Sequence, residues 1–437
     1  MSQSVTTSEL RAVVGELWRW QVMDVVRATT FVGALLLAWI SLRPFIDLGD
    51  TQIIDSTTGN EALTYAVFGC LAMLTIALSM RDDARGLATL LSPGYMLFGG
   101  WIVANVMLSL DPSTSIRRLA LTTFVTAVAA TLLLLPKTQH QLMRWIGVAA
   151  LALLAVCYLG ILLVPHLSIH LATDVQEPAL AGNWRGPFGH KNNAAGVMAM
   201  LLFLGIYVIR SGAWLSGVAI AALASLFLFY SAGKSSLTLC FAVLLLTSLT
   251  SFVRSFWLRA LVLLGPLLLL NLLGVGTVMN DTLASVAKLL PLDSSFTGRT
   301  DIWTFALQAL QLRPLTGYGF GAFWGSSAVQ NLPDGMEWAA TAANSHNGYL
   351  DTALALGLPG LALLILVVVI APLRNFQAAD RGGNDGPLAM ALLQVWLFGA
   401  YLSSLESFFF DRTDPLWFTF LVAVFGLHYL ARFRVRE

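Results

Sequence analysis

The chain has 437 residues, of which 57% are hydrophobic and 11% are charged, and its formal net charge is +1. A soluble domain carries about 25% charged residues, so this composition excludes a protein surrounded by water and indicates an integral membrane protein. Nucleic-acid binding is excluded as well, because it needs clustered lysines and arginines and the sequence has no such cluster.

Twelve apolar stretches are long enough to cross a bilayer, which requires about 20 mostly apolar residues. The sequence therefore predicts an all-α integral membrane protein with about twelve transmembrane helices. The stretches lie near residues 28–45, 62–80, 87–110, 119–135, 145–164, 193–209, 213–230, 235–253, 258–278, 348–373, 388–405 and 416–431.

Two long polar segments divide these stretches. Residues 28–278 hold the first nine predicted helices, with an external loop over 165–192 between the fifth and the sixth. A larger external loop over 279–347 follows, and residues 348–431 hold the last three helices. Residues 1–27 are too polar and too long for the start of a signal peptide, so we expect the first apolar stretch to remain as a helix. Long loops in compact proteins usually carry function.

The lysines and arginines predict the orientation, because cytoplasmic loops of membrane proteins hold most of these residues. Placing the N-terminus in the cytoplasm puts most of the 25 cationic side chains there, together with the C-terminal tail, residues 432–437. The remaining cations lie at external ends of helices, where they are candidates for binding a substrate: Arg43, Arg117, Arg118, Arg185, Lys191, Lys234, Lys288, Arg299, Arg313 and Arg412.

The three cysteines, Cys70, Cys157 and Cys240, lie inside apolar stretches. Their spacing fits neither a disulfide framework nor a metal site. We therefore predict that they are buried small hydrophobic residues, and we expect neither a metal nor a cofactor.

The first external loop ends in GNWRGPFGHKNNAAG, residues 182–196. Glycines and a proline interrupt the chain just before the sixth helix, which Asn192 or Asn193 can cap. Arginine binds phosphate through two parallel hydrogen bonds and lysine supplies a point charge, so this helix entrance is a candidate phosphate or sugar site. The alternative is an interfacial loop whose cations contact lipid headgroups. The candidate binding residues are Arg185, His190 and Lys191.

Lys234 lies in YSAGKSSL, at the external start of the eighth predicted helix. A charge at this depth is expensive unless it faces a cavity or a partner. Lys234 is therefore a further candidate for binding an anionic substrate, with snorkelling toward the lipid headgroups as the alternative.

The large loop contains TGRTDIW, residues 297–303. Thr300 or Asp301 can cap an amphipathic helix that runs to Leu312 and stops before Arg313-Pro314. The start of this helix would combine Arg299 with free backbone N–H groups, which suits an anion. One face of the helix is apolar: Ile302, Phe305, Ala306, Ala309 and Leu310.

The motif GYGFGAF, residues 317–323, follows this helix. Its glycines lie at alternate positions and no strand precedes them, so it is not a dinucleotide-binding fingerprint. We interpret it as a tight turn with aromatic anchors, or as a platform for a sugar.

His346 lies in NSHNGYLD, at the start of the tenth predicted helix, where Ser345 or Asn347 can act as the cap. The positive end of the helix dipole disfavours an imidazolium, and a neutral imidazole can accept a proton. His346 is therefore a candidate general base, and Asn344 and Asn347 are candidates for contacting substrate. The alternative is a histidine that only bonds a carbonyl group.

Glu406 lies at an external helix end in SLESFFFDRTDP, residues 404–415. Its carboxylate could orient His346 or pair with an external cation. The alternative is an ordinary loop salt bridge to Arg412.

Three motifs in this order resemble the O-antigen ligase/polymerase family of bacterial envelopes. They are RGxFGHKN around Arg185, TGRxxIW around Arg299 with P-L-x-G-x-G-x-G at 314–321, and SHNxYL around His346. The GHKNN variant is more similar to the exopolysaccharide polymerases of that family than to its lipid A-core ligases. The N-terminal helices resemble the family only in hydropathy.

The resemblance implies a membrane glycosyltransferase fold of the C type, with about twelve helices and a large periplasmic loop, in the bacterial inner membrane. It implies a metal-independent reaction on glycans linked to undecaprenyl diphosphate, and by motif it assigns functional roles to Arg299 and His346. Lys234 stands where ligases commonly have arginine, which weakens the prediction of a bidentate diphosphate contact there.

We therefore predict a polymerase of lipid-linked repeat units, in which Arg185, Lys234 and Arg299 bind the diphosphate, His346 takes the proton of the acceptor hydroxyl, and Glu406 orients His346. The expected partners are the undecaprenyl-diphosphate-linked donor, a glycan acceptor and the bilayer, with a chain-length regulator as the candidate protein partner. A ligase that uses another acceptor remains open, because the donor chemistry is the same. A transporter fits less well, because the polar motifs gather at helix ends and not near the bilayer midplane.

Overall fold

The computed structural model describes residues 7–49, 61–175, 177–289, 299–324, 329, 342–384, 386–411 and 413–433. Within these ranges the regular structure is helical, without a strand beyond the isolated bridge between Ile169 and Trp184. The main helices are α1 Thr7–Ile40, α3 Glu61–Ala88, α4 Pro93–Met107, α5 Pro112–Leu132, α6 Gln139–Leu163, α7 Pro165–Ser168, α8 Lys191–Arg210, α9 Trp214–Tyr230, α10 Lys234–Leu249, α11 Phe256–Leu273, α12 Gly276–Met279, α13 Asp281–Lys288, α14 Arg299–Leu312, α16 Gly348–Leu364, α17 Ala371–Gly382, α18 Gly386–Leu402 and α19 Pro415–Leu430.

The predicted all-α membrane architecture is confirmed. In the described chain, 7 helices are long and apolar enough to span a membrane, and the shorter helices α9, α10, α18 and α19 are also apolar. The prediction of one uninterrupted helix over 87–110 is wrong. The chain leaves α3 at Ala88, breaks at Ser92, and starts α4 with Pro93, because a proline is tolerated in the first turn of a helix and not in its interior.

The helix over 348–373 is also less regular than predicted. Gly357 has a φ of +69° inside α16, and a π-helical stretch, Ile365–Ile370, joins α16 to α17. A Cβ at Gly357 would lie 2.2 Å from the carbonyl oxygen of Leu315. Glycine is therefore required here both for the left-handed conformation and for the close approach of the large loop.

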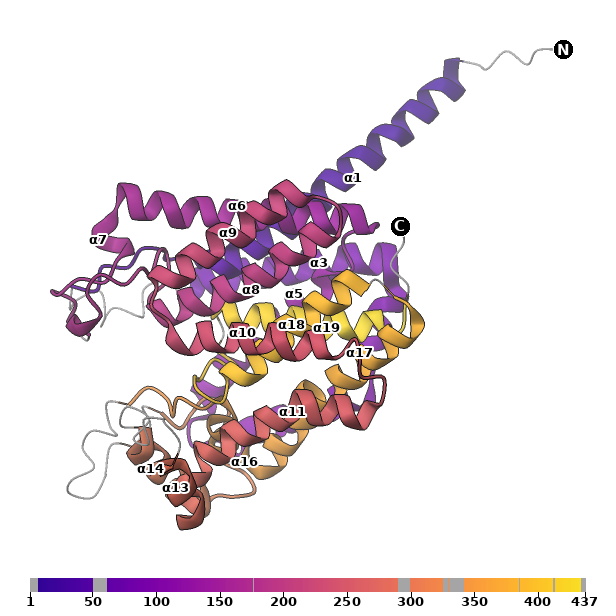
Figure 1. The fold of residues 1–437 in the computed structure, drawn as a ribbon. Coiled ribbons are helices and arrows are strands. Elements are labelled where there is room, and N and C mark those ends of the chain that lie inside the picture. The colour runs from indigo at the N-terminus through magenta and orange to yellow at the C-terminus, as the bar shows by residue number, and fades with distance from the viewer. Residues whose placement is uncertain are drawn as a thin grey trace.

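The centre of the bundle is formed by α8, α18 and α19 (Figure 1). Helix α18 contacts α8, α10 and α19, and its side chains from Leu388 to Leu402 are almost all buried. Helix α11 is different, because most of its surface faces outward. An apolar helix without a polar face must be surrounded by other helices or by lipid, so both kinds of helix fit a membrane protein.

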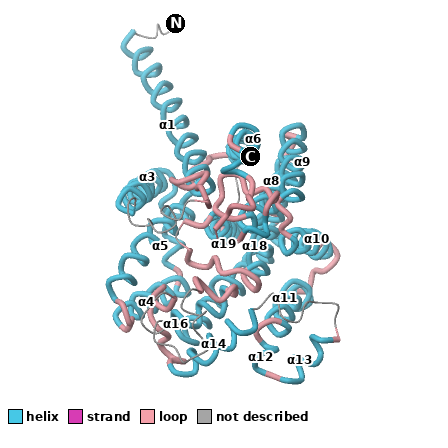
Figure 2. Tube along the Cα trace, turned by 90° about the vertical axis from the view of Figure 1, so that its left-hand side faces the viewer, coloured by secondary structure: helices cyan, strands magenta, loops and turns pink. Residues whose placement is uncertain are grey.

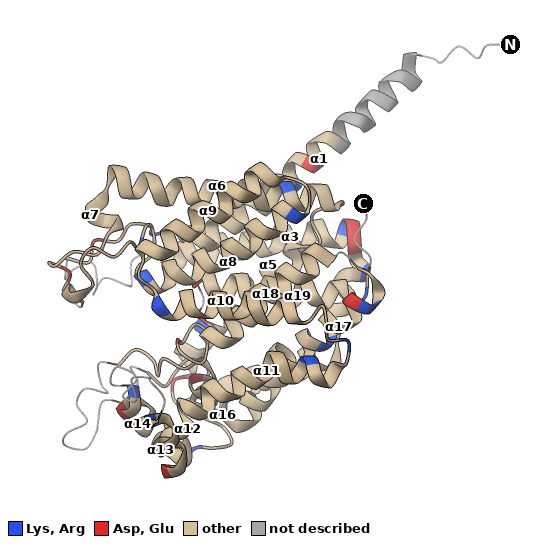
Figure 3. Cartoon of the chain, viewed as in Figure 1, with Lys and Arg blue, Asp and Glu red and all other residues tan. Residues whose placement is uncertain are grey.

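The two ends of the bundle differ. The start of α1 and the end of α19 lie at one end, whereas α7, α13 and α14 lie at the other (Figure 1). Seen from that second end, α14 lies beside α16, and α12 and α13 lie beside α11 (Figure 2). Most charged residues lie near the two ends and the middle is nearly free of them (Figure 3). The protein is thus a multi-pass membrane protein in which the described helices of its two long polar loops, α7, α13 and α14, share one end.

The cysteine prediction holds for two of the three residues. Cys157 and Cys240 are buried, but Cys70 is exposed on α3. The prediction for Cys70 is wrong because an apolar stretch in a membrane helix has a lipid-facing side, and hydropathy alone does not distinguish that side from the protein core.

Candidate active site

The carboxylate of Glu406 joins the two residues on which the sequence prediction depended. A guanidinium nitrogen of Arg299 lies 3.2 Å from Oε1 of Glu406, and Nδ1 of His346 lies 3.2 Å from Oε2. Arg299 also donates to the carbonyl oxygen of Leu405, and the side-chain amide of Asn192 donates to Oε1 at 3.1 Å. Residues from four separate stretches of the chain therefore meet at one carboxylate.

The environment of Glu406 keeps it ionised. Burial alone would raise the pKa of this carboxyl group, but the hydrogen bond from His346 and the positive charge of Arg299 outweigh burial and hold the pKa below its usual value. An ionised carboxylate only accepts hydrogen bonds, so the Nδ1 atom of His346 is the donor. The proton on Nδ1 leaves Nε2 as the acceptor when the ring is neutral. The side chain of His346 is 40% exposed, so a substrate can reach it.

The backbone around His346 is held by its neighbours. The predicted cap is confirmed for Asn347, whose side-chain oxygen accepts the N–H of Leu350 at 3.0 Å at the start of α16. The amide of the same side chain donates to Asn271 and to the carbonyl oxygen of Ser404. His346 has a φ of +52°, which is uncommon outside glycine and is found at functional sites. The side-chain oxygen of Asn344 accepts the N–H of His346 at 2.9 Å.

Arg299 is the first residue of α14. The predicted helix is confirmed in its end at Leu312 and in its buried face, which includes Phe305, Ala306, Ala309 and Leu310. The predicted cap is wrong, because the helix already begins at Arg299 and both Thr300 and Asp301 lie within its first turn. Trp303 on the buried face donates its indole N–H to the carbonyl oxygen of Ser345 at 2.9 Å. This bond ties the arginine helix directly to the histidine motif, which explains how two motifs far apart in the sequence keep a fixed distance.

The start of α8 differs from the prediction. His190 is the cap, with its Nδ1 atom accepting the N–H of Asn192 at 3.1 Å, so capping by Asn192 or Asn193 is wrong. The asparagine side chains point elsewhere instead. Asn192 reaches Glu406, and Asn193 donates to Asp414 at 3.2 Å. A cap formed by the preceding histidine frees Asn192 to contact the carboxylate.

Lys191 and Lys234 meet in a pocket beside Glu406. This lysine pocket has a volume of about 260 Å³, and its lining includes Lys191, Asn192, Lys234, Ser235 and Glu406. The ammonium group of Lys191 donates to the carbonyl oxygen of Ala232 at 3.2 Å. Gly233 permits the close approach, because a Cβ there would lie 2.3 Å from Cβ of Ala195. The lysines belong to different helices, α8 and α10, whose first residues they are.

Two predicted binding residues lie away from this cluster. Arg185 is fully buried and donates to the carbonyl oxygens of Phe188 and Ile46. Burial lowers the pKa of its guanidinium group, and the charges of Asp174 and Asp47 act in the opposite direction. The Nε2 atom of His190 lies 2.6 Å from a carboxylate oxygen of Glu177. Here both residues organise the loop before α8, and direct contact of either with substrate stays a prediction.

A second pocket lies on the other side of the histidine motif. This aromatic pocket has a volume of about 570 Å³ and is lined by Phe320, Phe323, Trp324, Asn344, Asp351, Asp411 and Arg118, among others. Ser407 lines it as well, whereas the preceding Glu406 lines the lysine pocket. Adjacent residues therefore line different pockets, and Glu406, the partner of His346, belongs to the lysine pocket.

The glycines of GYGFGAF shape the aromatic pocket. The predicted tight turn is confirmed, because Gly317, Gly319 and Gly321 all have positive φ. A Cβ at Gly321 would lie 2.5 Å from Cδ of Arg118, so glycine is needed for the arginine to pass. Phe320 and Phe323 then line the pocket, as a sugar platform would require. The alternative prediction, a loop salt bridge between Glu406 and Arg412, stays untested because Arg412 lies outside the described residues.

Sequence reasoning missed several residues of the site. Asn192 was considered only as a cap. Asn271 bonds both Asn347 and Ser404. The sequence feature that could have revealed it is a polar residue within an apolar helix. Asp351 accepts from the indole N–H of Trp324 at 2.8 Å and from the backbone N–H of Ser345. The sequence feature that could have revealed Asp351 is its place in the motif NSHNGYLD, five residues after His346. In the described part of the chain no three His, Cys, Asp or Glu side chains form a possible metal site.

His170 was also missed, although it holds the start of α8 in place. Its buried ring lies 2.8 Å from Asp174 through Nδ1 and accepts the backbone N–H of Lys191 through Nε2. Burial lowers the pKa of this histidine below its usual value, although the hydrogen bond to Asp174 acts in the opposite direction. The ring is therefore neutral in the folded protein, and it positions Lys191 at the lysine pocket.

We expect this histidine to make the fold pH-dependent. The pKa of a histidine in the unfolded chain is 6.5, and burial lowers the pKa of the folded His170 below it. Below pH 6.5 the unfolded chain therefore binds a proton that the folded ring does not. The contribution of His170 to the free energy of unfolding is complete above pH 6.5 and is lost as the pH falls. Replacing His170 with asparagine should cost about 1–3 kcal/mol at pH 7.5 and should flatten the fall in melting temperature between pH 7 and pH 5. Thermal unfolding in detergent measures both, with His166→Asn, an exposed histidine of the same loop, as the control. An unchanged pH profile would contradict the role of His170.

Residues 219–365 match the family model described as O-antigen ligase. The resemblance to the O-antigen ligase and polymerase family is confirmed. The matched stretch contains Lys234, Arg299 and His346, whereas Glu406 and the start of α8 lie outside it. The helical fold brings Glu406 and the start of α8 next to residues of the matched stretch.

The chain is also similar in part to a bacterial protein. It is 33% identical over 109 residues to the exopolysaccharide production protein ExoQ of Rhizobium meliloti (strain 1021). The alignment covers 24% of this chain and 24% of the relative, so the chain matches about a quarter of the length of that protein. The O-antigen ligase family match and this partial similarity are the two resemblances on which a functional proposal can draw.

Proposed function

We propose that this protein is a polymerase that transfers a glycan from undecaprenyl diphosphate to a sugar hydroxyl of an acceptor, at the periplasmic face of the bacterial inner membrane. One observation carries the proposal. A single carboxylate, Glu406, binds both Arg299 and His346 and lines a pocket with two lysines, and the next residue, Ser407, lines a pocket with aromatic and polar side chains.

The lysine pocket suits the donor diphosphate. The acceptor oxygen attacks the anomeric carbon of the donor sugar, the bond from that carbon to the phosphate oxygen breaks, and the diphosphate leaves with the electron pair. Lys191 and Lys234 line the pocket and Arg299 lies beside Glu406 at its edge, so three cations can offset the charge that develops on the leaving group. The lysines and the arginine supply this charge, and we propose that no metal ion takes part.

The histidine suits the acceptor hydroxyl. Its Nδ1–H is held by Glu406, which leaves Nε2 to take the proton as the new glycosidic bond forms. Glu406 also stabilises the imidazolium that results. Because Asn344 lines the aromatic pocket and binds the backbone of His346, an acceptor in that pocket would present a hydroxyl group beside the base.

The similarity to an exopolysaccharide production protein favours a polymerase. A ligase that moves a finished glycan to another acceptor is the second candidate, and the description of the matched family favours it. The two differ only in the acceptor. The decisive experiment therefore supplies the purified protein with one lipid-linked repeat unit as the sole substrate, with and without a chelator. Ladders of two and more units in both conditions support the proposal, and the absence of any product longer than the substrate contradicts it.

The lysines provide a separate test. Lys191→Ala and Lys234→Ala should each raise the KM for the lipid-linked donor on the order of tenfold or more, because a hydrogen bond to a charged group contributes about 1.5–3 kcal/mol. Lys288→Ala is the matched control, since this exposed lysine lies at the end of α13 and lines neither pocket. An equal KM for all three variants would contradict the proposal that the lysine pocket binds the diphosphate.

A further inference from the structure

Asp351 lies in the first turn of α16, five residues after His346, and the proposed reaction gives it no role. Both of its carboxylate oxygens lie 3.2 Å from the backbone nitrogen of Ser345, which donates to them. Oδ1 also accepts the indole N–H of Trp324 at 2.8 Å. A carboxylate only accepts hydrogen bonds, and the start of a helix favours a negative charge. The side chain is therefore engaged by two neighbouring donors.

The backbone of Ser345 is held from two directions. Asp351 binds its N–H, and Trp303 of α14 donates an indole N–H to its carbonyl oxygen at 2.9 Å. The next residue, His346, has a φ of +52°. This conformation is costly for a residue with a side chain, and it persists only where the surrounding contacts enforce it. The two bonds to Ser345 are such contacts, because they fix the chain directly before His346.

The position of the His346 ring depends on this backbone. Nδ1 of His346 lies 3.2 Å from Oε2 of Glu406, which is already at the upper end of the usual range for an N–H···O bond. A small rotation of the chain at His346 would therefore break the bond that leaves Nε2 as the proton acceptor. Asp351 binds Ser345 and not the ring, so any effect on the base passes through the backbone.

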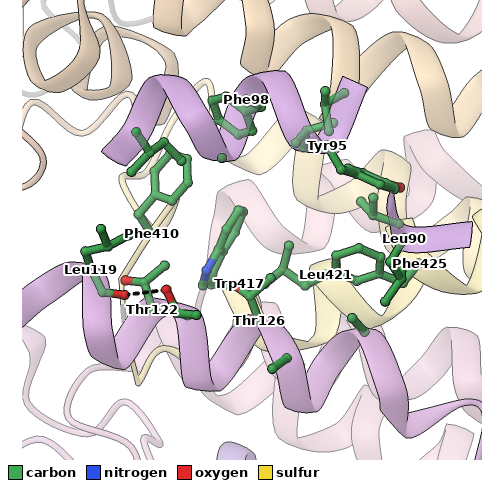
Figure 4. Close-up of a pocket in the computed structure, with 18 of the residues that line it drawn as sticks. Leu90, Tyr95, Phe98, Leu119, Thr122, Thr126, Phe410, Trp417, Leu421 and Phe425 are labelled. Carbon is green, nitrogen blue, oxygen red and sulfur yellow. Dashed lines mark hydrogen bonds between the residues drawn. The ribbon is translucent and has the colours of Figure 1, made fainter. Parts of the chain in front are cut away.

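The second donor, Trp324, belongs to the aromatic pocket, which Asp351 also lines. Phe410 lines both this pocket and an apolar cavity of about 450 Å³ among α4, α5 and α19 (Figure 4). Among the described residues that line the apolar cavity none is charged, so the charged groups that can orient an acceptor lie in the aromatic pocket. Asp351 is a charged group of that pocket that also binds the backbone beside His346.

We propose that Asp351 is a positioning residue for the base. It holds Ser345 so that the ring of His346 stays on Glu406, and it ties this backbone to Trp324 in the wall of the acceptor pocket. The inference rests on the proposed function, in which His346 takes the acceptor proton. Asp351 itself takes no proton from the acceptor, so its replacement should slow the reaction only while His346 is present.

The experiment introduces Asp351→Asn into the native chain and into His346→Ala. The full chain is purified in lipid nanodiscs and supplied with a radiolabelled lipid-linked repeat unit, so that the residual rate without the base can be measured. Asparagine has one acceptor oxygen, and its NH₂ group would face the N–H of Ser345. In the native chain kcat should fall roughly 10- to 100-fold, the loss expected when a hydrogen bond to a charged group is removed. In His346→Ala the further fall should be about twofold or less, because two changes that act through one group are not additive.

Two further variants complete the comparison. Trp324→Phe keeps an aromatic ring in the pocket wall and removes only the indole donor, so its loss of kcat should be smaller than that of Asp351→Asn and should also disappear in His346→Ala. Asp281→Asn is the matched control, since this exposed carboxylate at the start of α13 lines neither pocket. It should leave the rate unchanged in both backgrounds.

Thermal unfolding tests the contact without turnover. Asp351→Asn and Trp324→Phe should each lower the melting temperature, and the double variant should lower it no further than Asp351→Asn, because both changes remove the same bond. If this coupling is found in a protein that transfers no glycan, the proposed function fails while the contact between the two side chains stands.

Two outcomes would overturn the inference in a protein that does transfer glycan. One is an unchanged rate of Asp351→Asn in the native chain. The other is the same fractional loss in the native chain and in His346→Ala, because Asp351 would then act on the acceptor or on the fold as a whole and not through the base.

Discussion

Replacing His346 with alanine is expected to lower the rate of glycan transfer by a factor of about 10²–10⁴, the range that a general base contributes. The reason is geometric. Nδ1 of His346 is held by Glu406 at 3.2 Å, so Nε2 is the nitrogen that can take the acceptor proton. The measurement is the initial rate of ladder formation with a purified variant and a lipid-linked repeat unit. We expect kcat to fall and the KM for the donor to change little, because the proposed mechanism assigns the histidine to the acceptor and not to the diphosphate.

The controls separate loss of the base from loss of the fold. His166→Ala changes an exposed histidine of the other external loop and should leave the rate unchanged. Glu406→Gln keeps the shape of the side chain but removes the charge that supports an imidazolium, so its rate should lie between those of wild type and His346→Ala. Normal polymer from His346→Ala, with the protein folded and inserted, would end the assignment of this residue as the base.

Arg299→Ala and Arg299→Lys are both expected to lower the rate by a factor on the order of 10²–10³, the loss typical when one group that stabilises developing charge is removed. The guanidinium group of Arg299 binds Glu406 and the carbonyl oxygen of Leu405 at the same time. The ammonium group of lysine is a point charge and cannot reproduce this planar pair of contacts. Both variants should therefore lose the alignment of Glu406 as well as the charge next to the diphosphate.

The matched control is Arg313→Ala. Arg313 follows the same helix at its other end, where its guanidinium carbon lies 5.5 Å from the ring centre of Tyr318, away from Glu406. This variant should transfer glycan at close to the wild-type rate. Full activity of Arg299→Lys would contradict the planar contact and reduce Arg299 to a general positive charge.

The helices of this protein were predictable because a bilayer demands long apolar stretches. Each of the twelve predicted stretches overlaps a helix. The boundaries failed where local geometry mattered, as at Ser92 before α4 and at Gly357 inside α16. Hydropathy averages over many residues, so it does not detect a break that depends on one proline or on a close approach of two backbones.

The motifs also singled out residues that lie together in the structure. Arg299 and His346 stood out as polar residues at helix starts, and Glu406 as a carboxylate at an external helix end. Their meeting was a hypothesis that the structure confirms. Arg185 stood out for the same reason as Arg299, yet its guanidinium group is buried among backbone carbonyl oxygens. A sequence motif does not distinguish an arginine that faces a pocket from one that organises a loop.

By itself the sequence determined the membrane class, the helices and the identity of the charged residues at their external ends, because these follow from local composition and from the cost of placing charge in lipid. Tertiary structure alone decided that Asn192, Arg299 and His346 share one carboxylate, and that Glu406 and Ser407 face different pockets. The contacts at that carboxylate join residues more than 50 positions apart. They depend on how the helices pack, and local sequence patterns do not encode that packing.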